Sequence, residues 1–333
     1  MKKYLFLFLL IAMSLQSCYY IAKKIFKDEQ ADEATKTQIA AMNKTLFTSL
    51  ANNDVKGVKS LMSNRLILKL DSTFDVLVRS INEAYGKDAE YEVMDEFYTK
   101  NDNSEVSTTV SSPKAGGYKI SYIALNEETY VSVLVTKNAP INCVVLAIYG
   151  KYDDRWKLNI LELANYSAFG KNAPDYYDEA LKEYKEGNLI DAADNIIIAK
   201  SLATPLDKYL VYDDNAEMKA FHDKVLDEAN KKYKLPFTIK SIKQQPQILS
   251  ISPQAIVKDK HPGVYPIVRY KSAIPFTDTV ALKKENNDIQ KVIGTLYKGI
   301  DKHKKYILYM AYNNIPDDKT LTDRYGFVQT LGK

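Results

Sequence analysis

The spacing of apolar residues changes from a helical period to a period of two near residue 90, and this change constrains the fold more than any other feature. Apolar residues recur every three or four positions from Ile39 to Leu50, and again over residues 55–62 and 74–81. From Tyr91 onward they alternate with polar residues. The pattern predicts helices first, followed by a sheet against which their apolar faces pack.

Five runs in the first half of the chain have the alternation and the β-branched or aromatic content of strands. They are residues 91–98, 118–124, 129–136, 141–150 and 155–163. Short connections join them, and Asp153 and Asp154 form the last turn. We therefore expect a meander in which consecutive strands pair antiparallel.

Several short motifs accompany this order of elements. They are Leu46-Phe47, Asn53-Asp54, Val58, Leu61-Met62, Tyr85-Gly86-Lys87 and Arg155-Trp156-Lys157-Leu158. With helices before a curved sheet over about residues 37–165, the segment resembles the superfamily of nuclear transport factor and ketosteroid isomerase. The resemblance is architectural, because none of these motifs is catalytic. The cystatin fold, one helix against a similar sheet, is the competing interpretation.

That resemblance implies a cone-shaped α+β domain over residues 37–170, with a cavity between sheet and helices. Tyr130, Tyr149 and Trp156 lie on neighbouring predicted strands and are the candidate cavity-lining residues. Aromatic rings give a ligand pocket apolar walls with a polar handle. The alternative is that the same rings fill the core of a curved sheet.

Residues 171–235 return to a helical pattern. Two helices, 175–186 and 189–202, meet at Gly187-Asn188, and a third follows at 215–233. The hairpin resembles one tetratricopeptide repeat through its small and aromatic positions, which are Ala180, Tyr184, Gly187, Ala192, Ile196 and Ala199. Such repeats need about three units for stability. A spacer packed on its neighbours is therefore favoured over a peptide-binding array.

Residues 236–333 predict a small α+β domain without an assigned family. Strands are expected at 237–242, 247–257, 264–270, 306–312 and 325–331, with a helix at 279–300. Proline cannot donate a hydrogen bond within a sheet. Pro246, Pro253, Pro262 and Pro266 therefore predict edge strands and loops rather than a central sheet.

The N-terminus has the parts of a secretory signal: Lys2 and Lys3, an apolar run at 4–13, and a small residue before a cysteine. The run is too short to span a membrane permanently. Leu15-Gln16-Ser17-Cys18 resembles the bacterial lipobox. The resemblance implies cleavage between Ser17 and Cys18, which makes residues 1–17 a signal peptide, and lipid attachment at Cys18. Residues 18–36 are expected to be a tether, and two or three acyl chains would hold the protein at a bilayer.

Composition narrows the location and the partners. Without Lys2 and Lys3 the chain has 44 basic and 42 acidic residues. This near balance lacks the excess of positive charge that is typical of nucleic-acid-binding proteins. The 25 tyrosines resemble the bias of exported Bacteroidetes proteins. Tyr19 and Tyr20, rather than acidic residues, follow Cys18, which favours the periplasmic face of the outer membrane over the cell surface. Cys143 lies in an apolar run and predicts a buried, inert thiol.

The sequence contains no recognisable catalytic or metal-binding constellation, and we expect neither a cofactor nor a metal. It lacks a phosphate-binding loop and a nucleophile elbow. His222, His261 and His303 are scattered without the spacing of metal ligands. Carboxylates on the predicted strands, Asp95, Glu96 and Glu162, are candidates for an inward proton-transfer base, with surface charges as the alternative.

These observations favour a non-enzymatic, membrane-anchored lipoprotein that binds or scaffolds other proteins of the cell envelope. One alternative is a small-ligand binder or enzyme that uses the cavity of the first domain. Another is a periplasmic immunity-type lipoprotein that blocks a toxin. The oligomeric state is left open.

Overall fold

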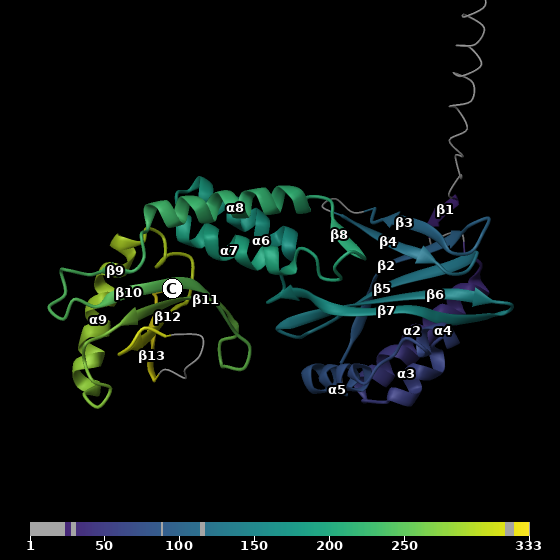
Figure 1. Cartoon of the computed structure of the whole chain (residues 1–333), viewed down its shortest axis with the longest axis horizontal. Helices are drawn as coiled ribbons and strands as arrows, with labels where there is room; N and C mark the ends of the chain where they lie inside the picture. The colour runs from purple at the N-terminus through teal and green to yellow at the C-terminus, as the bar shows by residue number, and fades with distance from the viewer. Residues whose placement is uncertain (1–23, 28–30, 88, 114–116, 317–322, 333) are drawn as a thin grey trace, which may run out of the picture.

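A computed structural model of the chain describes residues 24–27, 31–87, 89–113, 117–316 and 323–332. The predicted signal peptide, the cleavage site at Ser17 and the lipid attachment site at Cys18 lie outside these residues. The described chain has the predicted α+β class, with an N-terminal domain, a helical segment and a C-terminal domain following one another (Figure 1).

Four helices cover one face of the first sheet. The Asp32 carboxylate accepts a hydrogen bond from the Thr35 backbone N–H at 2.6 Å, and Asp54 accepts one from Gly57 at 2.9 Å. These caps start the first two helices. The helices are α2 (Glu33–Ala51), α3 (Val55–Leu61), α4 (Asn64–Ile67) and α5 (Thr73–Tyr85).

The first sheet is antiparallel and has the strand order β1-β2-β5-β6-β7. Its strands are β1 (Lys24–Lys27), β2 (Tyr91–Lys100), β5 (Glu128–Thr136), β6 (Ile141–Tyr152) and β7 (Arg155–Ala168). The predicted turn joins the last two, with Asp153 in the left-handed region at φ 52°.

The expectation that all consecutive strands pair is wrong for the strand at 118–124, which pairs with neither predicted neighbour. β2 pairs with β5, while β3 (Val106–Ser111) and β4 (Tyr118–Ala124) form a hairpin in a second sheet. β8 (Leu210–Tyr212) completes that sheet from the helical segment. β3 was not predicted, because only Thr108 and Val110 are buried in an otherwise serine- and threonine-rich run.

The expected tether at 18–36 also differs from the structure. Lys24–Lys27 forms β1, which pairs antiparallel with the end of β2, and helix α2 already begins at Glu33. The sequence gives no sign of β1, because a four-residue edge strand depends on a partner about 70 positions away. The folded body therefore begins closer to Cys18 than the sequence predicts.

The first sheet is buried on both faces, as β5 illustrates. Tyr130 and Leu134 face the helices α2 to α5, whereas Val131, Val133 and Val135 face the second sheet and the helical segment. The helical segment comprises α6 (Ala173–Lys185), α7 (Leu189–Leu202) and α8 (Asn215–Lys232). Its fully buried alanines lie in the same core, and they are Ala173, Ala180, Ala192 and Ala199. The segment thus packs directly on the N-terminal domain.

The C-terminal domain is a five-stranded sheet of order β13-β12-β11-β10-β9, with one helix on one face. Its elements are β9 (Phe237–Thr238), β10 (Gln247–Ile256), β11 (Gly263–Lys271), α9 (Thr279–Leu296), β12 (Tyr306–Tyr312) and β13 (Arg324–Thr330). β11 and β12 run parallel, and α9 connects them.

Pro246 and Pro262 lie in connections, as predicted, but the prediction is wrong for Pro253 and Pro266, which lie within strands. Pro253 and Pro266 are direct register partners in β10 and β11, and β11 is the central strand. Both prolines are tolerated because β9 pairs only near Ile248, and β12 pairs with β11 only from Ile267 onward. Neither proline therefore removes a ladder hydrogen bond to a described outer neighbour.

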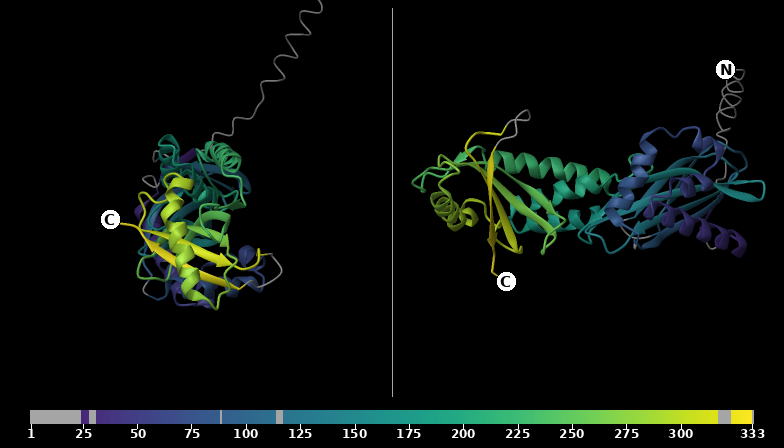
Figure 2. Two further views of the ribbon diagram at one scale, coloured as in Figure 1. Left: turned by 90° about the vertical axis from the view of Figure 1, so that its left-hand side faces the viewer. Right: turned by 90° about the horizontal axis from the view of Figure 1, so that it is seen from below.

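The three parts form an elongated body. β1 lies at one end, the C-terminal domain at the other, and α6 to α8 between them (Figures 1 and 2).

Candidate functional site

The three aromatic residues proposed to line a cavity come together in the packed core instead. Tyr130 and Tyr149 are 0% exposed and Trp156 is 3% exposed. The rings of Tyr130 and Trp156 meet edge to face, with 6.3 Å between centroids. Four cavities found among the described residues are lined by other side chains. Core filling, the alternative, is therefore what the structure supports.

A buried polar contact fixes helix α2 on this core. The Tyr149 hydroxyl donates to the Asn43 side-chain oxygen at 2.8 Å, and the Asn43 amide donates to Ser132 Oγ at 3.0 Å. Burial raises the pKa of Tyr149, so the phenol stays protonated at neutral pH. This arrangement is structural, because it leaves the hydroxyl committed to a protein partner.

The candidate carboxylates of β2 lie on opposite faces of the sheet and are both bound by neighbours. Asp95 accepts hydrogen bonds from Tyr118 and, at 3.0 Å, from Ser112. Glu96 accepts from the Asn43 amide at 3.4 Å and from Ser132 at 3.3 Å. On β7, burial raises the pKa of Glu162, and Lys208 opposes the rise. None of the three lines a cavity described above.

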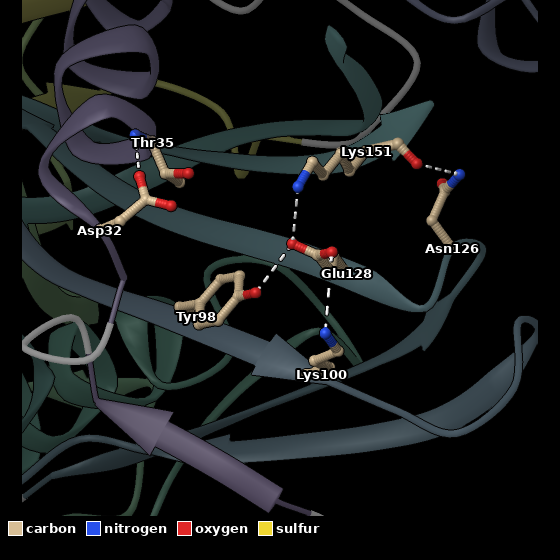
Figure 3. A network of polar contacts seen from close by, with 7 residues as sticks. All are labelled: Asp32, Thr35, Tyr98, Lys100, Asn126, Glu128 and Lys151. Carbon is tan, nitrogen blue, oxygen red and sulfur yellow. Dashed lines mark hydrogen bonds and ion pairs between the residues drawn. The ribbon is translucent and has the colours of Figure 1, made fainter. Parts of the chain in front are cut away.

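A polar network joins three adjacent strands of the first sheet near their ends (Figure 3). Glu128 accepts a hydrogen bond from the Tyr98 hydroxyl at 2.8 Å and one from Lys151 Nζ at 3.1 Å. Lys100 lies 4.0 Å from the same carboxylate, and the Asn126 amide donates to the Lys151 carbonyl oxygen at 3.0 Å. Because every group has a partner within the network, its role is to hold β2, β5 and β6 together.

The histidine and cysteine side chains of the described residues do not cluster into a site. His222 Nδ1 lies 2.9 Å from an Asp223 oxygen, and His261 Nδ1 lies 3.1 Å from Lys305 Nζ. No group of three histidine, cysteine, aspartate or glutamate side chains able to hold a metal ion occurs among the described residues. Cys143 is a buried free thiol, as predicted, and burial raises its pKa to about 11.

The strongest candidate site is a cavity of about 350 Å³ where the helical hairpin meets the C-terminal domain, here called the junction cavity. Three structural units supply its walls: the turn after β7, the helices α6 and α7, and the C-terminal domain through β11 and the turn before β12. The lining residues are Phe169, Lys171, Tyr176, Glu179, Lys182, Glu183, Asp191, Asp194, Asn195, Ile198, Val264, Tyr265, Pro266, Lys302, His303 and Lys304.

Two carboxylates of α7 lie at the inner wall of the junction cavity. Asp191 and Asp194 are three residues apart, so they share one face of the helix. Lys304 forms an ion pair with Asp191, and both of these side chains are largely buried. Burial raises the pKa of Asp191 to about 6 even though Lys304 opposes the rise. The pair joins the hairpin to the C-terminal domain.

Asp194 differs from Asp191 because it has no hydrogen-bond partner among the described residues. The residue is 9% exposed and lines the cavity. Burial raises the pKa of Asp194 to about 8, the Lys304 ammonium opposes the rise, and the Asp191 carboxylate adds to it. A largely buried carboxyl group that faces a cavity and has no donor among the described residues makes the cavity a candidate ligand site.

Three of the remaining charged residues of the junction cavity are engaged, whereas Lys182 and Lys302 have no ion pair among the described residues. Lys171 pairs with Glu179, and its ammonium group lies 5.6 Å from the centre of the Tyr176 ring. The Glu183 carboxylate accepts a hydrogen bond from Asn188 at 2.8 Å. Asp194 is thus the inner acceptor that a bound molecule would meet.

Sequence reasoning missed Asp191, Asp194 and Lys304. Lys304 is 113 residues from Asp191, and nothing local predicts that they meet. A signal did exist in α7, where two acids interrupt the otherwise apolar run Leu189-Ile190-Asp191-Ala192-Ala193-Asp194. In a helix buried on most sides, such acids are placed in the core and need partners.

No helix in the described part of the chain has the length and apolar character needed to cross a membrane. The resemblance to the nuclear transport factor superfamily and the lipobox interpretation both stay predictions. No protein-family model matches the chain, and no curated protein and no solved structure is significantly similar to it.

Proposed function

We propose that the protein is a non-enzymatic lipoprotein, anchored through Cys18 to the periplasmic face of the outer membrane, that binds another envelope protein through its C-terminal domain. The observation that carries the proposal is the arrangement of the body. β1, the described element nearest to Cys18, lies at the opposite end from the C-terminal domain (Figure 1).

Continuous packing supports this role for the helical segment. One core extends from the first sheet through α6, α7 and α8, and Ile190 of α7 belongs to the core of the C-terminal domain. The Lys298 ammonium donates to the Glu186 carbonyl oxygen at 3.2 Å, and Lys304 pairs with Asp191. The helices therefore hold the C-terminal domain at a fixed distance from the anchored end.

The partner surface that fits best is the edge strand β13. No described strand pairs with its outer side, and its residues alternate between half-buried and exposed, with Val328 61% exposed. An edge strand presents unpaired N–H and C=O groups to which an extended segment of another protein can add. The occupant we propose is such an extended segment from an envelope protein.

The aromatic residues Tyr130, Tyr149 and Trp156 no longer support the alternative of a ligand pocket inside the first domain. Their rings are packed against the helices rather than around a void. Any small-molecule site must therefore be sought elsewhere in the molecule.

Photo-crosslinking in intact cells tests the proposal. A photoreactive residue replaces Val328 on β13, and the matched control replaces Leu68 on the N-terminal domain, which is also apolar and 86% exposed. We expect a discrete crosslinked protein from position 328 and none from position 68. Equal crosslinking from both positions, or none from position 328, would contradict binding at β13.

A further inference from the structure

The inner wall of the junction cavity has more acid than base. Asp191, Asp194 and Lys304 meet there, so one ammonium group serves two carboxylates. The ion pair with Asp191 occupies Lys304 directly. Fully ionised, this wall would carry one negative charge that no described side chain neutralises at close range. Burying an uncompensated charge is unfavourable, so the wall has to take up either a proton or a cation.

Asp194 is the carboxylate that accounts for this excess of negative charge. Its side chain is nine-tenths buried, faces the cavity, and accepts no hydrogen bond from the described residues. An ionised carboxylate is an acceptor only, with room for several donors. The group that complements it is therefore a cation that carries N–H donors.

We propose that the junction cavity binds a small organic ammonium compound, whose ammonium group donates hydrogen bonds to the Asp194 carboxylate. This site goes beyond the proposed function and does not depend on it. Two sources share the chemistry: the amino group of an amino acid or short peptide, and an amino group of a diamine. The cavity volume, about 350 Å³, is at the lower end of the range for small-molecule sites.

The rest of the wall favours an organic cation over a bare metal ion. Apolar and aromatic side chains surround the carboxylates, and they provide contacts for a carbon skeleton. They are Phe169, Tyr176, Ile198, Val264, Tyr265 and Pro266. Asp191 is already held by Lys304, which leaves Asp194 as one free carboxylate where Ca²⁺ requires six to eight oxygen ligands.

Binding should be linked to release of a proton. Burial raises the pKa of Asp194 to about 8, so the carboxyl group is mostly protonated at pH 7 without ligand. An ammonium ligand requires the ionised form and therefore displaces that proton. The other charged or titratable groups around Asp194 come from every wall: Lys171, Glu179, Lys182, Glu183, Asp191, Lys302, His303 and Lys304. Apparent affinity is expected to increase as pH rises from 6 to 8 and to level off above the Asp194 pKa.

The test is isothermal titration of the full chain in detergent with L-alanine, L-lysine and putrescine as separate probes, and with acetate and Mg²⁺ as controls. We expect saturable binding of at least one ammonium probe. Titration in two buffers of different ionisation enthalpy should show close to one proton released for each ligand bound at pH 7. Preference for the amino acids or for putrescine identifies the source of the ammonium group.

The matched variants are Asp194→Asn, which keeps the shape and removes the charge, and Asp102→Asn, which changes an exposed aspartate far from the cavity. Asp194→Asn should weaken ammonium binding at least tenfold and abolish proton release, while Asp102→Asn leaves both unchanged. Absence of saturable binding by every ammonium probe would overturn the proposal. So would equal binding by Asp194→Asn, or binding of Mg²⁺ alone. The proton measurement on the unmodified chain keeps the test valid if a variant folds poorly.

Discussion

Glu128 and Asp194 are both sequestered carboxylates, but their surroundings move their pKa values in opposite directions. Burial alone would raise the pKa of Glu128, yet hydrogen bonds from Tyr98 and Lys151 hold it below the ordinary value (Figure 3). Burial raises the pKa of Asp194 to about 8, because no donor compensates for the lost water. Glu128 is therefore a structural group, whereas Asp194 is available to a ligand.

Replacing Glu128 tests the structural role at the residue scale. A lowered pKa stabilises the folded state above the ordinary glutamate pKa, and this stabilisation is lost as pH falls through the folded-state value. Glu128→Gln should cost about 1 kcal/mol of unfolding free energy at pH 7. The difference from the parent should shrink below about pH 4. Urea unfolding at several pH values measures it. The exposed neighbour provides the control, Glu127→Gln, and a cost equal in both variants would contradict the role of the network.

Asp194 predicts the reverse dependence on pH. Because its pKa is raised in the folded state, it stabilises the ligand-free protein at low pH. That contribution is lost as pH rises from the ordinary aspartate pKa, 3.8, to about 8. Asp194→Asn should therefore match the parent near pH 4 and be more stable than the parent at pH 8.5, in unfolding measured without ligand. A variant less stable than the parent at pH 8.5 would show that the carboxylate already has a partner.

At the scale of elements, the contact between the α6–α7 turn and the turn after α9 decides whether the C-terminal domain is fixed to the helices. Gly299 has φ 95°, and a Cβ atom there would lie 2.6 Å from the Asn188 side-chain oxygen. Asn188 is 4% exposed, so it has little room to move. The glycine is therefore required both by its backbone conformation and by the close approach of the two turns.

Gly299→Ala should destabilise the protein more than Gly170→Ala. Gly170 also has positive φ, 79°, but no atom lies within 4 Å of the added Cβ, so this variant measures the backbone strain alone, about 1–2 kcal/mol. The difference between the two variants reports the contact with Asn188. Thermal unfolding measures the loss of stability, and limited proteolysis measures cleavage in the C-terminal domain, after residue 235. Equal destabilisation would mean that the turns separate without cost.

The spacing of apolar residues predicted the elements well where the buried positions follow the repeat of a helix or a strand. The helix α7 and the strand β12 have the predicted bounds, and α6, α8 and α9 differ from theirs by a few residues. Pairing was less predictable, because the β3–β4 hairpin lies between β2 and its partner β5, and because Pro253 and Pro266 occupy places where no outer strand pairs. The junction cavity was beyond prediction, since Asp194 and Lys304 meet only through the packing of two domains.

At the scale of the whole molecule, the short distance along the chain from Cys18 to Lys24 constrains how the body sits at a membrane. Lys24 begins β1 and is six positions after the cysteine. An extended chain of that length spans at most about 20 Å. A lipid on Cys18 would therefore keep the start of the N-terminal domain close to the bilayer, and the C-terminal domain lies at the other end of the body (Figure 2).

The N-terminal tryptic peptide of the protein purified from membranes tests the central claim most directly, because its mass reports both cleavage and lipid attachment. We predict a peptide of residues 18–23 that begins at Cys18 and carries a thioether-linked diacylglycerol and an acylated amino group. In the control Cys18→Ser, residues 1–17 should remain attached and the lipid should be absent. A parent peptide with an unmodified thiol at Cys18, or a mature chain that starts at another residue, would contradict the account.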